Sequence, residues 1–201
     1  MSTDNEVIER SIGSPEEFAT LYDRYAGTIH RYAARRIGAE VADDILSETF
    51  LVAFDKRRVF DDSATSALPW LLGIATTLLK QHARREAVAW KGMVAGIAAD
   101  VVPDAIERAG ARMDAARSAK RLEGALRRLS VGDRDTVLLY AWGDLDYQGI
   151  ATALGVPLGT VRSRLNRARR LLRSALDIAT DTDTERESFH GRTDTAPQRS
   201  Y

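Results

Sequence analysis

The chain has 201 residues, of which 44% are hydrophobic, and its 29 basic and 29 acidic side chains give a formal net charge of zero. It has no cysteine, which excludes disulfides and cysteine-ligated zinc, and its three histidines are widely spaced, so we expect no metal and no cofactor. No apolar run approaches the roughly 20 residues that cross a bilayer, and residues 1–11 are too polar for a secretory signal. We therefore expect a cytoplasmic protein without membrane insertion.

The first strong helix signal begins at Ser14, after an N-terminal extension of residues 1–13. Ser14 has the pattern of an N-cap, with Pro15 at the first helical position and Glu17 three residues after the cap. Apolar side chains then recur at spacings of three and four, which predicts a helix that ends near Gly38.

Two more helices are predicted before residue 86. One runs from about Glu40 to Lys56, with an apolar inner face and acidic residues on its outer side. A loop over residues 60–69 separates it from the next helix, which runs from about Pro69 to Arg85 and ends in a basic group. Trp70 lies in the apolar stripe of that helix, which favours a core position over a role as a wedge between bases. We expect these three helices to close one small domain over residues 14–86.

The helical periodicity decays after this domain. Three glycines and Pro103 interrupt it, which predicts a linker over residues 87–116. Periodicity resumes in a second domain over residues 117–176, and residues 177–201 are polar and rich in small side chains, which predicts a disordered tail. The sequence therefore indicates an all-α fold of two small helical domains, joined by a linker and followed by a tail.

The segment from Asp146 to Arg173 has the signals of a helix-turn-helix. Asp146 is an N-cap, Gly155 can adopt a positive φ, and Pro157 prevents the first helix from continuing. The second helix carries six arginines and no acid between Leu158 and Arg173.

At 3.6 residues per turn this second helix has one apolar and one polar face. The apolar stripe consists of Val161, Leu165, Ala168 and Leu172, and the opposite face holds Ser163, Asn166, Arg167 and Arg170, with Arg162 at its edge. A helix that buries one face and offers arginines on the other fits the major groove of DNA. A solvated arginine face on an ordinary amphipathic helix is the alternative.

Two blocks of the sequence resemble the extracytoplasmic-function (ECF) group of bacterial sigma factors. The segments FATLYDRYAGTIHRYAARR, ADDILSETFLVAF and PWLLGIATTLLKQHARR are similar to region two, and VPLGTVRSRLNRARRLL is similar to region four. The resemblance covers residues 14–86 and 117–176, with the blocks in the family's order and spacing. It implies an RNA polymerase sigma factor that binds core polymerase, reads −35 and −10 promoter elements, and aids strand opening.

The resemblance also assigns three sets of site residues. Core polymerase binding, through the β′ clamp helices, is assigned to Asp43, Asp44, Ser47 and Glu48. Contacts to the −35 element are assigned to Thr160, Arg162, Ser163, Arg164, Asn166, Arg167 and Arg170, with Thr160 and Arg164 on phosphates. Contacts to the −10 element are assigned to Asp61, Asp62, Ser63, Thr77, Lys80, Arg84 and Arg85.

The chain departs from the family pattern at three places. Ser47 stands where the family often has glutamine, so one of the polymerase contacts that the resemblance implies can differ in this chain. Thr76 and Thr77 stand where arginine and asparagine are common. In the family that asparagine usually helps to read the −10 element, so the resemblance does not give the −10 sequence that this chain prefers. Gly149 lies inside a helix, where glycine costs about 1 kcal/mol relative to alanine.

Three classes of function remain open from the sequence: a sigma factor, a helix-turn-helix regulator that binds an operator as a dimer, and an interaction protein, which is a sigma-like module that a partner holds and that uses DNA weakly. The acidic block ADDILSETF favours the first, because a simple repressor has no need of a polymerase-clamp surface. No nucleophile motif, glycine-rich phosphate loop or paired histidine and carboxylate is present, so we do not expect an enzyme.

The expected partners follow from the resemblance. They are core RNA polymerase, through the β′ clamp helices and the β flap, promoter DNA, and an anti-sigma factor that holds the protein inactive. The tail, residues 177–201, is acidic, with six acids against three arginines. It is either a regulatory extension or a disordered end without a role.

Overall fold

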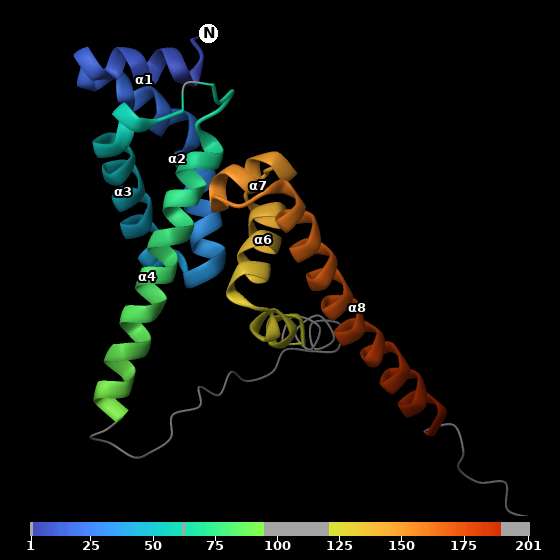
Figure 1. Cartoon of the computed structure of the whole chain (residues 1–201). Coiled ribbons are helices and arrows are strands. Elements are labelled where there is room, and N and C mark those ends of the chain that lie inside the picture. The colour runs from blue at the N-terminus through green and yellow to red at the C-terminus, as the bar shows by residue number, and fades with distance from the viewer. Residues whose placement is uncertain (1, 62, 95–120, 190–201) are drawn as a thin grey trace, which may run out of the picture. The chain divides into compact units, whose positions relative to one another are not determined.

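The computed structural model describes residues 2–61, 63–94 and 121–189, and within these ranges it contains helices and no strands (Figure 1). The elements are α1 (Asp4–Gly13), η1 (Pro15–Phe18), α2 (Ala19–Ile37), α3 (Ala39–Lys56), η2 (Arg57–Val59), α4 (Leu68–Val94), α6 (Val131–Trp142), α7 (Tyr147–Leu154) and α8 (Leu158–Phe189). Residues 121–128 are also helical. The predicted all-α fold is confirmed. None of the helices in the described part combines the length and hydropathy that a bilayer crossing needs.

The chain divides into two compact units. Unit 1 consists of Met1–Asp104 with Asp135–Leu165, and unit 2 consists of Ala105–Arg134 with Asn166–Tyr201. The predicted linker, residues 87–116, lies mostly outside the described residues, so the division into domains at that linker remains a prediction.

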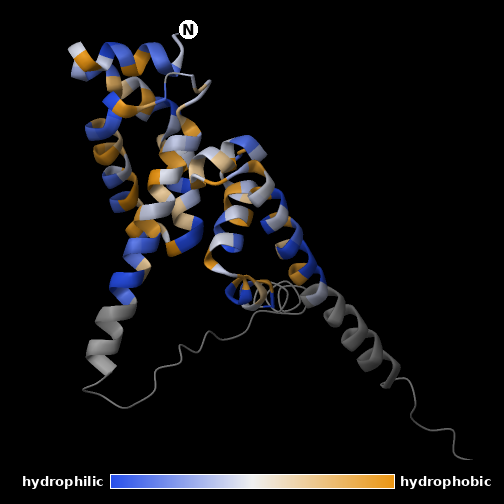
Figure 2. Ribbon diagram, viewed as in Figure 1, coloured by the Kyte–Doolittle hydropathy of each residue, from blue (hydrophilic) through white to orange (hydrophobic). Residues whose placement is uncertain are grey.

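One apolar core runs through unit 1, and apolar and polar residues alternate along its helices (Figure 2). Its fully buried side chains include Leu21, Ile29, Tyr32, Leu71, Leu72, Leu139, Ile150, Val161 and Leu165. Each large aliphatic side chain that leaves water in this way contributes about 1.5–3 kcal/mol. Because these residues come from α2, α4, α6, α7 and the start of α8, the helix-turn-helix shares the core of the N-terminal helices.

The N-terminal segment is an integral helix, which the sequence reading missed when it treated residues 1–13 as an extension. Thr3 and Glu6 form a capping box, with the Glu6 amide donating to Thr3 Oγ1 at 3.3 Å and the Thr3 amide donating to Glu6 Oε2 at 2.9 Å. Val7 and Ile8 are buried in the core of unit 1. The T-x-x-E signature in the sequence was sufficient to indicate this start.

The helix start predicted at Ser14 was wrong in its details. Ser14 makes no side-chain cap bond, and residues Pro15–Phe18 form a short 3-10 helix before α2. Glu17, expected to complete a capping box, pairs instead with Arg10 of α1 at 3.3 Å. Ser14 and Pro15 therefore lie in the tight connection between α1 and α2, and they do not cap a long helix.

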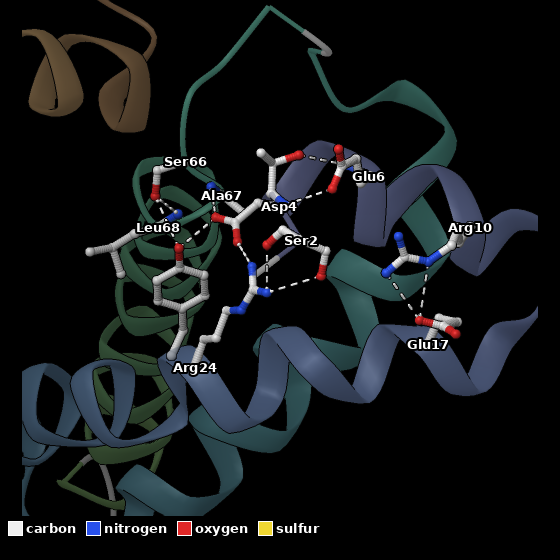
Figure 3. A network of polar contacts seen from close by, with 11 residues as sticks. Ser2, Asp4, Glu6, Arg10, Glu17, Arg24, Ser66, Ala67 and Leu68 are labelled. Carbon is white, nitrogen blue, oxygen red and sulfur yellow. Dashed lines mark hydrogen bonds and ion pairs between the residues drawn. The ribbon is translucent and has the colours of Figure 1, made fainter.

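Asp4 fixes α1 to its neighbours (Figure 3). Its buried carboxylate, 5% exposed, accepts hydrogen bonds from the Arg24 guanidinium, from the Tyr25 hydroxyl, and from the Ala67 amide at 2.7 Å. Burial alone would raise the pKa of Asp4, but the bonds from Tyr25, Ala67 and Arg24 together hold the pKa below its ordinary value. The carboxylate therefore stays charged and ties α1 to α2 and to the segment before α4.

Two helices extend further than the sequence predicted. α4 continues past Arg85 to Val94, and α8 continues to Phe189, although the composition beyond residue 176 favoured a disordered tail. No glycine or proline interrupts the chain between Gly159 and Phe189, so nothing local stops the helix. Trp70 is half-buried; it packs on Phe60, with ring centroids 5.0 Å apart, and lies against the core, in agreement with its place in the apolar stripe.

Candidate nucleic-acid and polymerase interfaces

The helix-turn-helix has the caps that its sequence predicted. The Asp146 carboxylate accepts from the Gly149 amide at 2.7 Å, and Gly155 ends α7 with a φ of 61°. A Cβ at Gly149 would lie 3.1 Å from Asp146 Oδ1 and 3.3 Å from the Leu145 side chain. These separations are tighter than most Cβ contacts, so a side chain at this position would require Asp146 or Leu145 to shift by a few tenths of an ångström.

α8 separates an apolar and a polar face as predicted. Val161, Leu165 and Ala168 are at most 2% exposed, and Leu172 is half-buried. Among the residues expected to contact the −35 element, five are exposed: Arg162, Ser163, Asn166, Arg167 and Arg170. The other two, Thr160 and Arg164, are half-buried. The Ser163 hydroxyl donates to the Thr160 carbonyl at 3.0 Å. The placement suits a helix in a groove, and the role of each side chain remains a prediction.

Arg167 differs from the other cations of this face because unit 2 gives it an acidic partner. Its Nη2 lies 2.7 Å from Asp133 Oδ1, and its Nε lies 3.1 Å from Asp133 Oδ2. The hydrogen bonds that Arg167 donates to Asp133, together with the charge of this carboxylate, raise the pKa of Arg167. Asp133 is 5% exposed, and it occupies the fork that a guanine edge would take. The sequence reading missed Asp133, whose only signal was an acid in the first turn of α6.

The four residues expected to bind polymerase lie together on α3. Asp43, Asp44, Ser47 and Glu48 are exposed, and the opposite side of the helix buries Ile45 and Thr49 among other residues. His30 lies 3.3 Å from Asp43. Leu51 continues this face one turn beyond Glu48 and is 66% exposed, a feature that the sequence reading missed.

The residues expected at −10 lie on the loop before α4 and along α4. Asp61 and Ser63 are exposed, and Asp62 lies outside the described residues. Asp61 Oδ1 accepts from the Ser63 hydroxyl at 2.7 Å and from its amide at 3.0 Å, and these bonds lower the pKa of Asp61. The Asp61 carboxylate therefore holds both the amide and the hydroxyl of Ser63.

On α4 the expected −10 residues differ in exposure. Thr77, Arg84 and Arg85 are exposed, whereas Lys80 is half-buried. The Thr77 hydroxyl donates to the Gly73 carbonyl at 3.0 Å, so its polar group is engaged by its own helix. Lys80 Nζ lies 2.8 Å from Asp135 of α6, a contact that no local sequence pattern indicated.

Comparison with known proteins agrees with this arrangement. The model of Sigma-70 region 2 matches residues 21–88, and that of Sigma-70, region 4 matches residues 119–172. The ECF RNA polymerase sigma factor SigL of Mycobacterium tuberculosis strain H37Rv is 33% identical over 160 residues, which cover 78% of this chain and 86% of SigL. The chain belongs to the ECF RNA polymerase sigma factors. It is therefore a transcription initiation factor, a class of proteins without enzymatic activity.

This ECF sigma factor is also similar to HrpL of Pseudomonas syringae pv. syringae, with 33% identity over 147 residues, 69% of this chain and 75% of HrpL. Two solved structures share its fold. CnrH, in complex with the cytosolic domain of CnrY, has a TM-score of 0.61 and 23% identity, over 88% of this chain and 99% of CnrH. RpoE of Bartonella quintana, in complex with the anti-sigma factor NepR, has a TM-score of 0.58 and 19% identity, over 81% and 98%.

Proposed function

We propose that this sigma factor binds core RNA polymerase through the exposed face of α3, reads the −35 element with α8, and reads and helps to open the −10 element with the loop before α4 and with α4. The observation that carries the proposal is the face of α8 that exposes Arg162 and Asn166 while Val161 and Leu165 are buried beneath it. Such a helix can enter a major groove while it stays anchored in the protein.

At −35, Arg162 and Asn166 are the proposed base readers. Arginine can donate two hydrogen bonds to a guanine edge, and a good bidentate contact discriminates by about 1–3 kcal/mol. Thr160 and Arg164, which are half-buried nearer the apolar side, suit phosphates, which fix register without reading sequence.

At −10, the loop over residues 61–68 is proposed to capture a base that leaves the duplex. Extracting a base costs a few kcal/mol, which stacking and edge contacts with the loop must offset. The turn between Asp61 and Ser63 supports this role. Lys80, Arg84 and Arg85 follow along α4 and are proposed to hold the opened strand through its phosphates.

The polymerase contact is proposed for Asp43, Asp44, Ser47 and Glu48. Carboxylates on adjacent turns can accept charge-assisted hydrogen bonds from basic groups of the β′ clamp helices. Leu51, exposed on the same face, adds an apolar group to this surface. The helix-turn-helix is proposed to contact the β flap.

Regulation by an anti-sigma factor is proposed from the solved relatives. CnrH was solved with the cytosolic domain of CnrY, and RpoE with the anti-sigma factor NepR. We propose that a protein of this class holds the present chain inactive and that the chain acts in the cytoplasm.

Run-off transcription with purified bacterial core polymerase tests the proposal, with DNA from upstream of the chain's own gene as template. We expect specific transcripts that core polymerase alone does not make, and their start sites locate both promoter elements. Tight binding of the isolated protein to duplex DNA without any transcription would instead favour a dimeric regulator.

A further inference from the structure

A buried carboxylate joins three helices of unit 1. Asp135 of α6 is 1% exposed, and its Oδ1 lies 2.7 Å from Arg36 Nη2 of α2. Its Oδ2 lies 2.8 Å from Lys80 Nζ of α4, close enough for an ion pair although the approach is not aligned for a hydrogen bond. One negative group therefore sits between two positive groups that come from distant parts of the sequence.

The two cations are positioned by the N-terminal helices themselves. Arg36 Nη1 donates to the Tyr32 hydroxyl at 2.7 Å, and this hydroxyl lies 2.9 Å from Thr76 Oγ1. Burial raises the pKa of Tyr32, so its hydroxyl is neutral and can accept from Arg36 while it donates to Thr76. The Arg36 guanidinium is therefore held by Tyr32 of α2, which in turn contacts Thr76 of α4, and neither contact involves α6.

The contact of α4 with α7 also depends on a missing side chain. A Cβ at Gly73 would lie 2.4 Å from the Ala153 carbonyl oxygen, a separation that atoms cannot adopt. Only glycine therefore allows the two backbones to approach this closely. The contact that covers this side of α4 can be broken without changing any charge.

The covered side of α4 is next to the loop proposed for −10 capture. Asp61, Ser63 and Ser66 of the loop line a cavity of about 570 Å³ together with Asp146 and Gln148 at the start of α7. Within unit 1, α7 therefore faces the segment that a −10 strand would have to reach.

We propose that Arg36 and Lys80 form a binding site for a phosphate of the opened promoter strand, and that Asp135 occupies this site in the chain on its own. The inference rests on the proposed function at −10. A phosphodiester carries the same charge as a carboxylate and offers two oxygens to a guanidinium in a similar geometry. α6 and α7 must then leave α4 before the strand binds, so DNA and the helix-turn-helix compete for one pair of cations.

Opening of this contact can be measured directly because the chain has no cysteine of its own. Cysteines introduced at the exposed positions Gln81 of α4 and Ala141 of α6 accept a pair of dyes for resonance energy transfer. Gly73→Ala is expected to lower the transfer efficiency. Gly124→Ala is the matched control, since a Cβ there meets no atom within 4 Å, and it is expected to leave the efficiency unchanged.

Binding of fluorescent oligothymidylate, which offers phosphates without a promoter sequence, tests the anion site. The apparent affinity of a partly closed protein is reduced by the fraction that is open. Gly73→Ala is therefore expected to bind roughly tenfold tighter than wild type, and Arg36→Ala in that background is expected to remove most of the gain and to reduce the salt slope by about one.

Asp135→Asn is a second opening variant, and it is expected to tighten oligothymidylate binding as Gly73→Ala does. Because it also removes a negative charge, Asp55→Asn on the exposed face of α3 serves as its charge-matched control and is expected to leave the affinity unchanged. Circular dichroism of each variant verifies that the helices remain.

Three outcomes would overturn the proposal. If Gly73→Ala and Asp135→Asn leave the transfer efficiency unchanged, the contact is not a barrier that opens. If they open the protein but bind oligothymidylate no tighter, or if Arg36→Ala has no effect in the open background, the pair is not a phosphate site. Run-off transcription by the wild-type chain separates this failure from failure of the proposed function, because it requires only that the chain works as a sigma factor.

Discussion

The exposed acidic residues of α3 differ from the acidic residues that are buried in unit 1. Asp43, Asp44 and Glu48 are exposed on one helix face, where a partner can reach them. Asp4 and Asp135 are at most 5% exposed; the Asp4 carboxylate accepts hydrogen bonds from several elements of unit 1, and the Asp135 carboxylate pairs with Arg36 and Lys80. Position relative to the core thus decides whether an acid is available for recognition or fixes the arrangement of helices. Each class should respond differently to substitution.

The largest effect is expected from a buried acid. Asp4→Asn leaves Arg24 without its charged partner, and such a loss typically costs about 3–5 kcal/mol. Urea unfolding followed by circular dichroism measures the loss. Asp55→Asn, on the exposed side of α3, is the control and should change the free energy of unfolding by less than about 0.5 kcal/mol. Equal stabilities of the two variants would contradict the distinction between buried and exposed acids.

Two arginines of α8 offer the same contrast among cations. Arg162 is exposed, and Arg162→Ala is expected to weaken −35 duplex binding by about 1–3 kcal/mol without a change in melting temperature. Arg167 braces the buried Asp133, so Arg167→Ala is expected to lower the melting temperature as well. Fluorescence anisotropy and thermal melting separate the two effects. Undiminished promoter output from a folded variant with alanine at both positions would refute the −35 assignment.

The exposed acids are expected to matter only in the complex. Reversal of Asp44 and Glu48 to lysine should weaken binding to core polymerase at least tenfold, about 1.4 kcal/mol, because it replaces acceptors with like charges opposite basic groups. The free energy of unfolding should change little. Co-purification with core enzyme measures the first quantity, and undiminished recovery would count against this surface.

The smallest effect is expected from acid titration. Since the folded pKa of Asp4 lies below its ordinary value of 3.8, its charge stabilises the fold fully above that value, and this contribution is lost as the pH falls through the folded pKa. The difference in stability between wild type and Asp4→Asn should therefore be constant near neutral pH and shrink below about pH 4. A difference that grows on acidification would contradict the direction of the shift.

Local patterns in the sequence were enough to predict several parts of the fold and site. The spacing of Val161, Leu165 and Ala168 placed the buried stripe of α8, and Asp146 and Gly155 marked the ends of α7. The exposed face of α3 followed from the same periodicity. These features depend on residues within one or two turns of each other, where spacing determines the side of the helix.

The contacts that the sequence did not predict join distant segments. Asp4 bonds to the amide of Ala67, and Asp135 pairs with Arg36, and no periodicity relates such positions. The resemblance assigns Lys80 to the −10 element, whereas its contact with Asp135 depends on the packing of α4 with α6. Partners of this kind follow from tertiary packing, which a helical pattern leaves open.

Exposed acids on α3 and exposed arginines on α8 give a chain with no net charge two surfaces of opposite sign. Near neutral pH such a chain is drawn to both cation- and anion-exchange resins, and its copies attract one another when salt is low. Purification and storage should therefore use moderate salt, which screens this attraction. The same screening weakens the DNA contact, so the salt that keeps the protein dispersed must be diluted before transcription is measured.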